Sequence, residues 1–217
     1  MSLFISFEGI EGCGKTTQVG LLNSYLTSRG YPCLVTREPG GTKIGDQIRA
    51  ILLRSENSDL TLKAELFLYM ASRVQHVETV ILPALSQGNL ILCDRFSDST
   101  AVYQGLVQGI DFTLIEEMNR IATDGIIPDI TLLIDCPVEG SLQRAWKRYE
   151  QNAQDADHAR FERKEIDFHH RVRKGYLALA RKEPGRIKVI DGDRDPLVIH
   201  GEISTLVSAR LEERVKG

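Results

Sequence analysis

The sequence predicts an α/β fold, a five-stranded parallel sheet with helices on both faces. Three observations point to it. Short apolar runs alternate with longer segments whose apolar residues recur at helical spacing. The runs are continuously apolar, as strands buried on both faces are. A glycine-rich turn also joins the first run directly to the first helix. We therefore expect one domain over residues 1–217.

Five apolar runs are the expected strands. Each has the length of a strand and is bounded by turn residues or by polar residues. They cover residues 3–7, 32–36, 89–94, 130–135 and 187–191. Because helical segments separate them, the strands should run parallel to one another.

In the first half of the chain, apolar spacing predicts helices over about 17–26, 44–52 and 60–86. Ser58 or Asp59 should cap the longest of them, since both side chains can accept from the first free amides. Pro83 should kink that helix or end it late, because proline removes one helical hydrogen bond.

In the second half, helices are expected near 98–104, over 111–123 with Asp111 as the N-cap, and from Pro137 onward. Two later helices are expected, one around 168–179 and one opened by Pro196. The helix after Pro137 should bury one stripe, made of Leu142, Ala145, Trp146 and Tyr149. Between them, residues 151–159 are rich in Asn, Gln, Asp and His, which predicts a solvated flap.

Residues 9–17 fit the pattern G-x-x-x-x-G-K-[ST] without a gap. Its glycines let backbone N–H groups turn inward around a polyphosphate, and the next helix directs the positive end of its dipole there. Lys15 adds a positive charge, and the Thr16 hydroxyl can ligate Mg²⁺. Strand, loop and helix follow in the required order, so we expect the phosphate-binding loop of a P-loop NTPase fold. Its members are Gly9, Ile10, Glu11, Gly12, Cys13, Gly14, Lys15, Thr16 and Thr17.

Two arginines follow neighbouring strands. Arg37 comes after the second expected strand and Arg95 after the third. Ligands of open parallel sheets bind beyond the carboxyl ends of the strands, so both guanidinium groups should face the phosphate loop. Such a pair suits a second phosphate group, which arginine can bind bidentately. The alternative is two surface arginines paired with Glu38 and Asp94.

Bulk properties exclude several classes of protein. The 27 basic and 30 acidic residues give a net charge of −3, and no basic block predicts nucleic-acid binding. No apolar stretch is long enough to predict a membrane span. The cysteines Cys13, Cys33, Cys93 and Cys136 lack C-x-x-C spacing, which favours free thiols in a reducing, cytoplasmic location. The GTPase strings D-x-x-G and N-K-x-D are absent from the sequence, which argues against a GTP switch.

Several strings, taken together, resemble thymidylate kinases of the bacterial type, within the P-loop nucleoside monophosphate kinases. They are F-E-G-I-E-G-C-G-K-T-T at 7–17, T-R-E-P-G-G-T at 36–42, A-S-R at 71–73, D-R-F at 94–96, S-T-A-V-Y-Q-G at 99–105 and P-D-I-T-L-L-I-D at 128–135. The first string is widespread, whereas the combination of the others is specific to this family. The resemblance covers nearly the whole chain and implies phosphorylation of dTMP to dTDP by ATP, in dTTP synthesis, by a homodimer.

The resemblance also implies roles for residues. Residues 9–17 would hold the ATP phosphates and Mg²⁺, while Arg37 and Arg95 would clamp the dTMP phosphate within a monophosphate-binding region of about 37–105. Asp94 would hold a Mg²⁺-bound water or orient Arg95. Glu11 would approach the sugar 3′-hydroxyl. The base would meet Arg73 at its edge and Tyr69 or Phe67 on its face, with Ser99, Thr100 and Gln104 completing the pocket.

In eukaryotic members of the family, the position of Gly12 is an arginine that reaches the transferred phosphoryl group. Here it is glycine, so the resemblance implies that a mobile lid, about 144–163, supplies this charge. The lid offers Arg144, Arg148, Arg160 and Arg163. Arg160 matches best, because R-F-E at 160–162 resembles the R-[FI]-E string of the family; Arg144 and Arg148 remain alternatives.

Two other functions stay open from the sequence. One is a kinase of the same fold acting on another nucleoside monophosphate. The other is a nucleotide-dependent switch or partition protein that transfers no phosphoryl group. A phosphate loop alone is compatible with either, because fold and nucleotide binding do not define a reaction.

Overall fold

The computed structural model describes residues 2–151 and 159–216. The described residues form a five-stranded sheet in the order β2-β3-β1-β4-β5, and all neighbouring strands are parallel. The strands are β1 (Leu3–Glu8), β2 (Cys33–Arg37), β3 (Leu90–Asp94), β4 (Ile130–Asp135) and β5 (Ile187–Asp191). Each lies within one or two residues of its expected place. The predicted α/β fold is thus confirmed.

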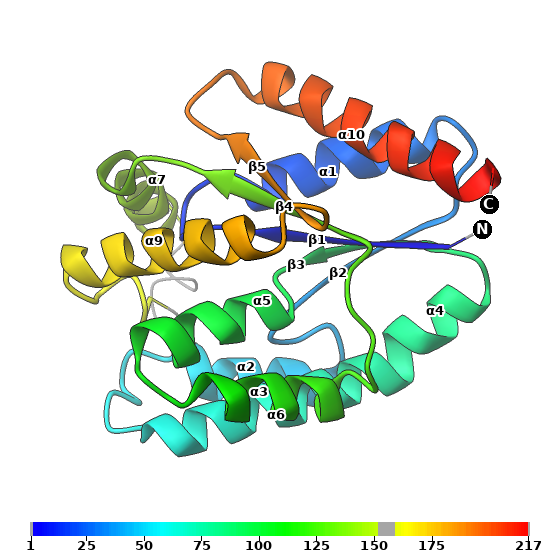
Figure 1. The fold of residues 1–217 in the computed structure, drawn as a ribbon. Coiled ribbons are helices and arrows are strands. Elements are labelled where there is room, and N and C mark those ends of the chain that lie inside the picture. The colour runs from blue at the N-terminus through cyan, green and yellow to red at the C-terminus, as the bar shows by residue number, and fades with distance from the viewer. Residues whose placement is uncertain (1, 152–158, 217) are drawn as a thin grey trace.

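Helices cover both faces of this sheet (Figure 1). On one face lie α1 (Lys15–Thr27) and α10 (Pro196–Lys216). On the other lie α9 and the helices of the middle of the chain. The remaining helical elements of the described chain are α2 (Lys43–Leu53), α3 (Leu62–His76), the π-helical η1 (Val77–Ile81), α4 (Leu82–Ser86), α5 (Ser97–Thr100), the π-helical η2 (Ala101–Val107), α6 (Phe112–Ala122), α7 (Val138–Gln151) and α9 (Ile166–Lys182).

The longest expected helix is interrupted by a π-helical turn. α3 continues through η1 into α4, so the predicted irregularity near Pro83 is present. Pro83 has no N–H to donate, and just before it the N–H of Leu82 bonds to Val77, five residues back. The expected caps, Ser58 and Asp59, were wrong. The helix starts later, after Thr61, because the chain first turns through a bond from Leu60 to Asn57.

Two expectations near the lid also need correction. Gln151 belongs to the end of α7, and Ala159 is fully buried, so neither edge of the expected solvated flap is a flap residue. Residues 152–158, the rest of that prediction, lie outside the described residues. Trp146 is 37% exposed, because α7 turns Ala145 and Tyr149 inward instead.

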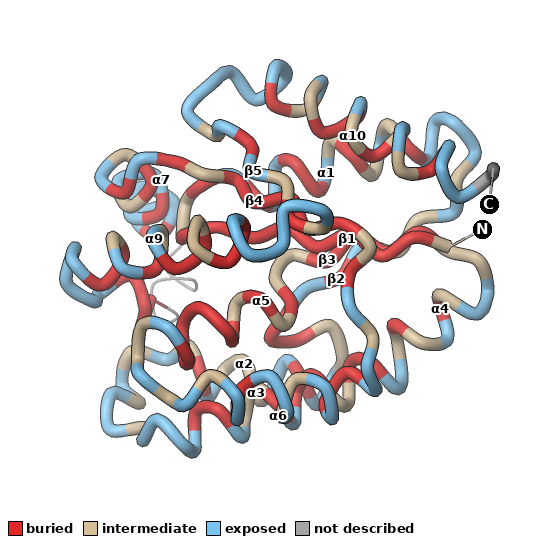
Figure 2. Tube along the Cα trace, in the orientation of Figure 1, coloured by how far each residue is buried: buried red, intermediate tan, exposed pale blue. Residues whose placement is uncertain are grey.

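The core lies on both faces of the sheet. Almost every residue of β1 and β4 is buried, because helices rather than water cover both faces of these strands. Figure 2 shows the buried backbone running through the strands while exposed residues lie on the outer sides of the helices. Each fully buried leucine or isoleucine here stabilises the fold by about 1.5–3 kcal/mol. The core therefore holds the strand ends rigidly.

The strand register brings the carboxyl ends of β1, β2 and β3 together. Phe7 is paired with Asp94, and Asp94 with Arg37 across the other edge of β3. Residues 9–14 follow β1 directly and lead into α1. Side chains from three strand ends and one loop therefore surround one opening. No helix in the described part of the chain is long and apolar enough to cross a membrane.

Candidate active site

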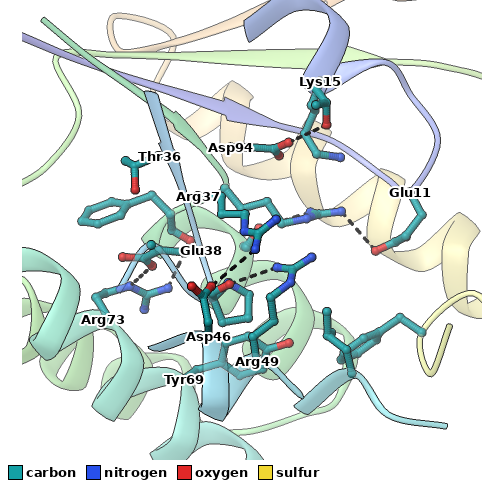
Figure 3. A pocket seen from close by; sticks show the side chains of 18 of the residues that line it. Glu11, Lys15, Thr36, Arg37, Glu38, Asp46, Arg49, Tyr69, Arg73 and Asp94 are labelled. Atoms are coloured by element: carbon teal, nitrogen blue, oxygen red, sulfur yellow. Dashed lines mark hydrogen bonds and ion pairs between the residues drawn. The ribbon is translucent and has the colours of Figure 1, made fainter. Parts of the chain in front are cut away.

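A cavity of about 920 Å³ opens at these strand ends. Figure 3 shows side chains from the phosphate loop, the end of β2, α2 and α3 lining one space. The expected site residues that line it are Glu11, Gly12, Lys15, Thr16, Arg37, Tyr69, Arg73, Asp94, Arg95, Ser99, Thr100, Gln104 and Arg148. One cavity therefore contains candidates for both nucleotides.

The phosphate loop adopts the backbone that its glycines predict. Gly9, Gly12 and Gly14 all have positive φ, at 138°, 71° and 96°. Lys15 folds back over the loop, where its ammonium group donates to the carbonyl of Gly9 at 3.1 Å and that of Ile10 at 2.9 Å. These carbonyls hold the charge at the position where phosphate oxygens would meet it.

Gly12 lies against the first half of α7. A Cβ on Gly12 would come within 2.0 Å of the Ser141 carbonyl oxygen and 3.1 Å of the Ala145 nitrogen. Arg144, one turn along α7, donates from Nε to the Gly12 carbonyl at 3.0 Å. The absence of a side chain at Gly12 is thus what lets α7 pack directly on the loop.

Thr16 and Asp94 form the pair that fits a metal ion. The Thr16 hydroxyl donates to Asp94 Oδ2 at 2.9 Å. Adjacent oxygen ligands of octahedral Mg²⁺ lie roughly 3 Å apart, so this spacing suits two neighbouring ligands or one ligand and a bound water. The other expected role of Asp94 was to orient Arg95. Among the described residues no hydrogen bond joins the two side chains, because the Arg95 guanidinium group bonds to other residues.

Arg95 faces the phosphate loop. Its backbone has a φ of 70°, and its amide donates to the Phe7 carbonyl at 2.9 Å, which turns the chain out of β3. The guanidinium group donates to Glu11 at 3.1 Å, Tyr176 at 3.0 Å and Ser99 at 3.3 Å. The alternative pairing with Asp94 is therefore wrong for Arg95.

Arg37 is held much more loosely. Its side chain is 56% exposed, and its ion pair is with Asp46 of α2, at 3.4 Å, rather than with Glu38. Arg49, also on α2, lines the same cavity and donates to the Pro39 carbonyl at 3.0 Å. Figure 3 places Arg37 and Arg49 between Asp94 and Tyr69. The cavity thus has two guanidinium groups with few protein partners.

Glu11 is a charged group held within the loop. Its Oε1 accepts from Tyr103 at 2.5 Å and from Arg95, while Oε2 lies 3.5 Å from Nδ1 of the fully buried His169. Burial alone would raise the pKa of Glu11, but the His169 contact and the charges of Arg95 and Lys15 bring it well below its ordinary value. Glu11 is therefore ionised across the neutral pH range.

Arg73 is buried at the other end of the cavity. It donates to Glu38 at 2.7 Å, Asn119 at 2.6 Å, Thr100 at 3.0 Å and the Phe96 carbonyl at 3.2 Å. Arginine has five N–H groups, so among the described residues one of them, on Nη1, is left for a ligand. Arg73 therefore presents a single donor in a fixed place.

Two aromatic residues of α3, Tyr69 and Phe67, were the alternatives for stacking on a base. Tyr69 lines the cavity, whereas Phe67 is 64% exposed and lies outside the described lining. Burial raises the pKa of Tyr69, with the nearby Glu65 charge adding to the effect, so its phenol is neutral. Of the two rings, only that of Tyr69 can meet a ligand here.

The four arginines of the expected lid lie in different places. Arg148 lines the cavity beside Tyr149. Arg144 contacts the phosphate loop, as described above. Arg160 is buried away from the described lining, with Nε donating to the Leu52 carbonyl at 2.6 Å and an ion pair to Glu65. Its motif likeness therefore does not place Arg160 beside the phosphates, and Arg163 is exposed.

Sequence reasoning missed several residues that line the cavity and one that supports the lining. Glu8 lies outside the described lining and is fully buried; it accepts from the Phe96 amide, Ser99 and Tyr176, and burial raises its pKa against the opposing charge of Arg95. Nothing in the sequence marked Arg49 as a site residue, because charged residues are common on short surface helices. Tyr103 lay inside a quoted family string and could have been found. Other lining residues that were missed include Glu38, Tyr149, Phe161 and Glu162.

Comparisons with known proteins point to one family. The family model described as "Thymidylate kinase" matches residues 7–203. A thymidylate kinase of Desulfosudis oleivorans is 53% identical, over 87% of this chain and 88% of that protein. One of Trichlorobacter lovleyi is 50% identical over 96% and 98%. The crystal structure of thymidylate kinase from Ehrlichia chaffeensis superposes with a TM-score of 0.74 at 36% identity, covering 95% of this chain and 98% of that one.

Proposed function

This chain belongs to the thymidylate kinase family, and from that premise we propose how its cavity carries out the reaction. The enzyme transfers the γ-phosphoryl group of ATP to dTMP, giving dTDP and ADP. One observation carries the assignment of residues: the phosphate loop and a second set of guanidinium groups line the same cavity. Positioning and charge stabilisation are most of what phosphoryl transfer asks of a protein.

The ATP phosphates occupy residues 9–17 in this proposal. The inward amides at the positive-φ glycines receive the phosphate oxygens, and Lys15 exchanges its loop carbonyls for them. Thr16 and Asp94 would hold Mg²⁺, directly or through water, and the 2.9 Å spacing of their oxygens supports this. When bound, that ion neutralises charge that develops on the phosphates.

The dTMP phosphate lies against Arg95, Arg37 and Arg49. Arg95 is fixed by its bonds to Glu11, Tyr176 and Ser99, so it can set the position of the acceptor. Arg37 and Arg49 have few partners and can turn their forks to the phosphate oxygens. Glu11, ionised and beside Arg95, accepts from the sugar 3′-hydroxyl.

The base lies between Tyr69 and the buried groups beyond it. Tyr69 offers an apolar ring face, and Arg73 offers its one remaining N–H to a carbonyl oxygen. Ser99, Thr100 and Gln104 complete this end. Four hydrogen bonds hold Arg73 in place, so its remaining N–H group has a fixed direction. This supports recognition of a base edge with an acceptor at that position.

Arg148 is the lid arginine that we assign to the transferred phosphoryl group. It lines the cavity, whereas Arg160 lies outside the described lining and is paired with Glu65. Arg144 assists less directly, because it bonds the Gly12 carbonyl. In this assignment the positive charge comes from α7.

We further propose a homodimer through the outer face of α3 and α6. Apolar side chains there are largely exposed: Leu62, Phe67, Leu114 and Ile121. Both helices lie on the same outer side of the molecule (Figure 1), and apolar exposure of this kind marks interaction surfaces. Sedimentation should give twice the chain mass. A cytoplasmic location is supported by the free thiols of the four cysteines.

A coupled assay tests the reaction directly. ADP formation is measured with dTMP, dUMP, dCMP, AMP and GMP offered one at a time. We expect dTMP to give the highest kcat/KM and ATP alone to give almost no ADP. A faster reaction with another monophosphate would favour a different kinase of this fold, and ATP consumption without any monophosphate would favour a switch protein.

A further inference from the structure

A buried cluster lies behind the base end of the cavity. Its centre is Glu65 of α3, which is 1% exposed. Glu65 Oε1 accepts from the side-chain amide of Gln104 at 2.8 Å and from that of Gln108 at 3.0 Å. Its Oε2 pairs with Arg160. One carboxylate thus joins α3, η2 and the segment after α7 that contains Arg160.

The charge of Arg160 determines what Glu65 can do. Arg160 is fixed by two further bonds, from its Nε to the Leu52 carbonyl at 2.6 Å and from its backbone amide to the Leu53 carbonyl at 3.2 Å. A carboxylate held against a guanidinium group is ionised and can only accept hydrogen bonds. Any amide that meets it must therefore present its NH₂ group.

This fixes the orientation of the Gln104 amide. A free glutamine can exchange the places of its oxygen and nitrogen by turning about its last bond. With Glu65 opposite, the exchanged form would place two acceptors against each other without a proton between them. Gln104 also lines the cavity. Its Nε2 is committed to Glu65, so its oxygen is the part of the amide that a ligand meets.

The result is an asymmetric pair of groups at the base end. Arg73 contributes one N–H donor, and Gln104 contributes one acceptor; Thr100, which bonds Arg73, lies one turn before Gln104 on the same helical run. Thymine and uracil present a carbonyl oxygen next to an N3–H donor. Cytosine presents the opposite pattern, an amino group next to an N3 acceptor. The fixed pair therefore matches the first edge and leaves unpaired groups against the second.

We propose that Glu65, held by Arg160, is a positioning residue that makes the site specific for a pyrimidine with an N3–H group. It acts through Gln104 and does not touch the substrate itself. The proposal rests on the function proposed above, because it takes Arg73 and Gln104 to face the base of the acceptor. It also gives Arg160 a role that its position in the fold supports.

The test is the substitution Glu65→Gln, which keeps the shape of the side chain. The new amide would turn its oxygen to Arg160 and its NH₂ to Gln104, so the Gln104 oxygen would follow it and its NH₂ would face the base. We expect kcat/KM for dTMP to fall by about 30-fold through KM, while that for dCMP does not fall, since this is the middle of the range that an unpaired buried group costs. The ratio of the two values is the readout.

Gln108→Ala is the matched control. It removes the other amide donor of Glu65 and leaves Gln104 in place; Gln108 lies outside the described lining of the cavity. Its ratio of dTMP to dCMP should stay within about threefold of wild type. Thermal unfolding of each variant shows that it is folded before the rates are compared.

A folded Glu65→Gln protein with the wild-type ratio overturns the proposal. So does an equal loss of kcat for both substrates, which is what a merely structural role predicts. If Glu65→Gln does not fold, Glu65→Leu with Arg160→Met replaces the buried pair by apolar side chains and frees the Gln104 amide to turn, so the same two outcomes decide. Failure of the proposed function is distinct, because wild-type protein would then not prefer dTMP.

Discussion

The two ends of the cavity are built differently. At the phosphate end, Arg37 is more than half exposed with one ion pair at 3.4 Å, and Thr16 is exposed. At the base end, Arg73 and Glu65 are each 1% exposed, and each has at least three described partners. At the phosphate end, N–H donors are left without a protein partner among the described residues. At the base end, almost all N–H donors are already hydrogen-bonded.

This contrast separates selection from chemistry. In the proposed assignment, the groups of the base end are already paired without substrate, so this end loses little conformational freedom on binding and rejects a wrong edge by leaving buried groups unpaired. The phosphate end holds its cations on carbonyls and on one carboxylate that phosphate oxygens can replace. Changes at the two ends should therefore differ in kind.

The largest effect is expected at the phosphate end, from Lys15→Ala. Loss of this charge should lower kcat by about 10³-fold or more, because it acts where charge develops during transfer. Affinity for dTMP, measured by titration calorimetry without ATP, should stay within about threefold of wild type. A parallel loss of dTMP affinity would show that the two ends are not independent.

Arg73→Ala should give the largest loss of stability. It leaves Glu38 buried without its guanidinium partner, which costs about 3–5 kcal/mol in the free energy of unfolding. Arg37→Ala is the matched change at the exposed end and should cost less than about 1 kcal/mol. Urea unfolding without ligands measures both. Similar losses for the two variants would contradict the contrast.

Arg148→Ala should lower kcat by about 10²-fold and leave KM for dTMP nearly unchanged, as expected for a contact made in the transition state. Arg163→Ala is the control, since this arginine is exposed and outside the described lining. Steady-state kinetics at saturating ATP separates the two. A mild effect of Arg148→Ala would refute its assignment to the transferred group.

The smallest effect concerns pH and Glu11. Its folded-state pKa lies below the ordinary value of 4.5, so its charge stabilises the fold fully above about pH 5 and this stabilisation is lost as pH falls. The difference in free energy of unfolding between wild type and Glu11→Gln should therefore shrink by about 1 kcal/mol between about pH 6 and pH 3. Comparison with this variant cancels the opposite contribution of Glu8. A constant difference would mean that Glu11 is not stabilised by its neighbours.

The sequence predicted what local patterns determine. Apolar runs determine the strands, and near neighbours in the sequence determine the glycine loop and the Asp111 cap. The Asp111 side chain accepts from the Leu114 amide, three residues on. The pairing of Arg160 could not be predicted, because its partner Glu65 lies 95 residues away and nothing local indicates that direction. Glu65 itself reads as a solvent-facing charge on an amphipathic helix. A motif marks a segment, but the contacts of its side chains depend on tertiary neighbours.

The close packing of α7 on Gly12 limits how this enzyme can evolve. An arginine there, as eukaryotic members of the family have, would place its Cβ inside the backbone of the lid helix, at a φ that L-residues rarely adopt. A single codon change would therefore disrupt the fold before it added any catalytic charge. If α7 supplies that charge as proposed, the two arrangements exclude each other, and a lineage could exchange one for the other only after this helix had first moved away.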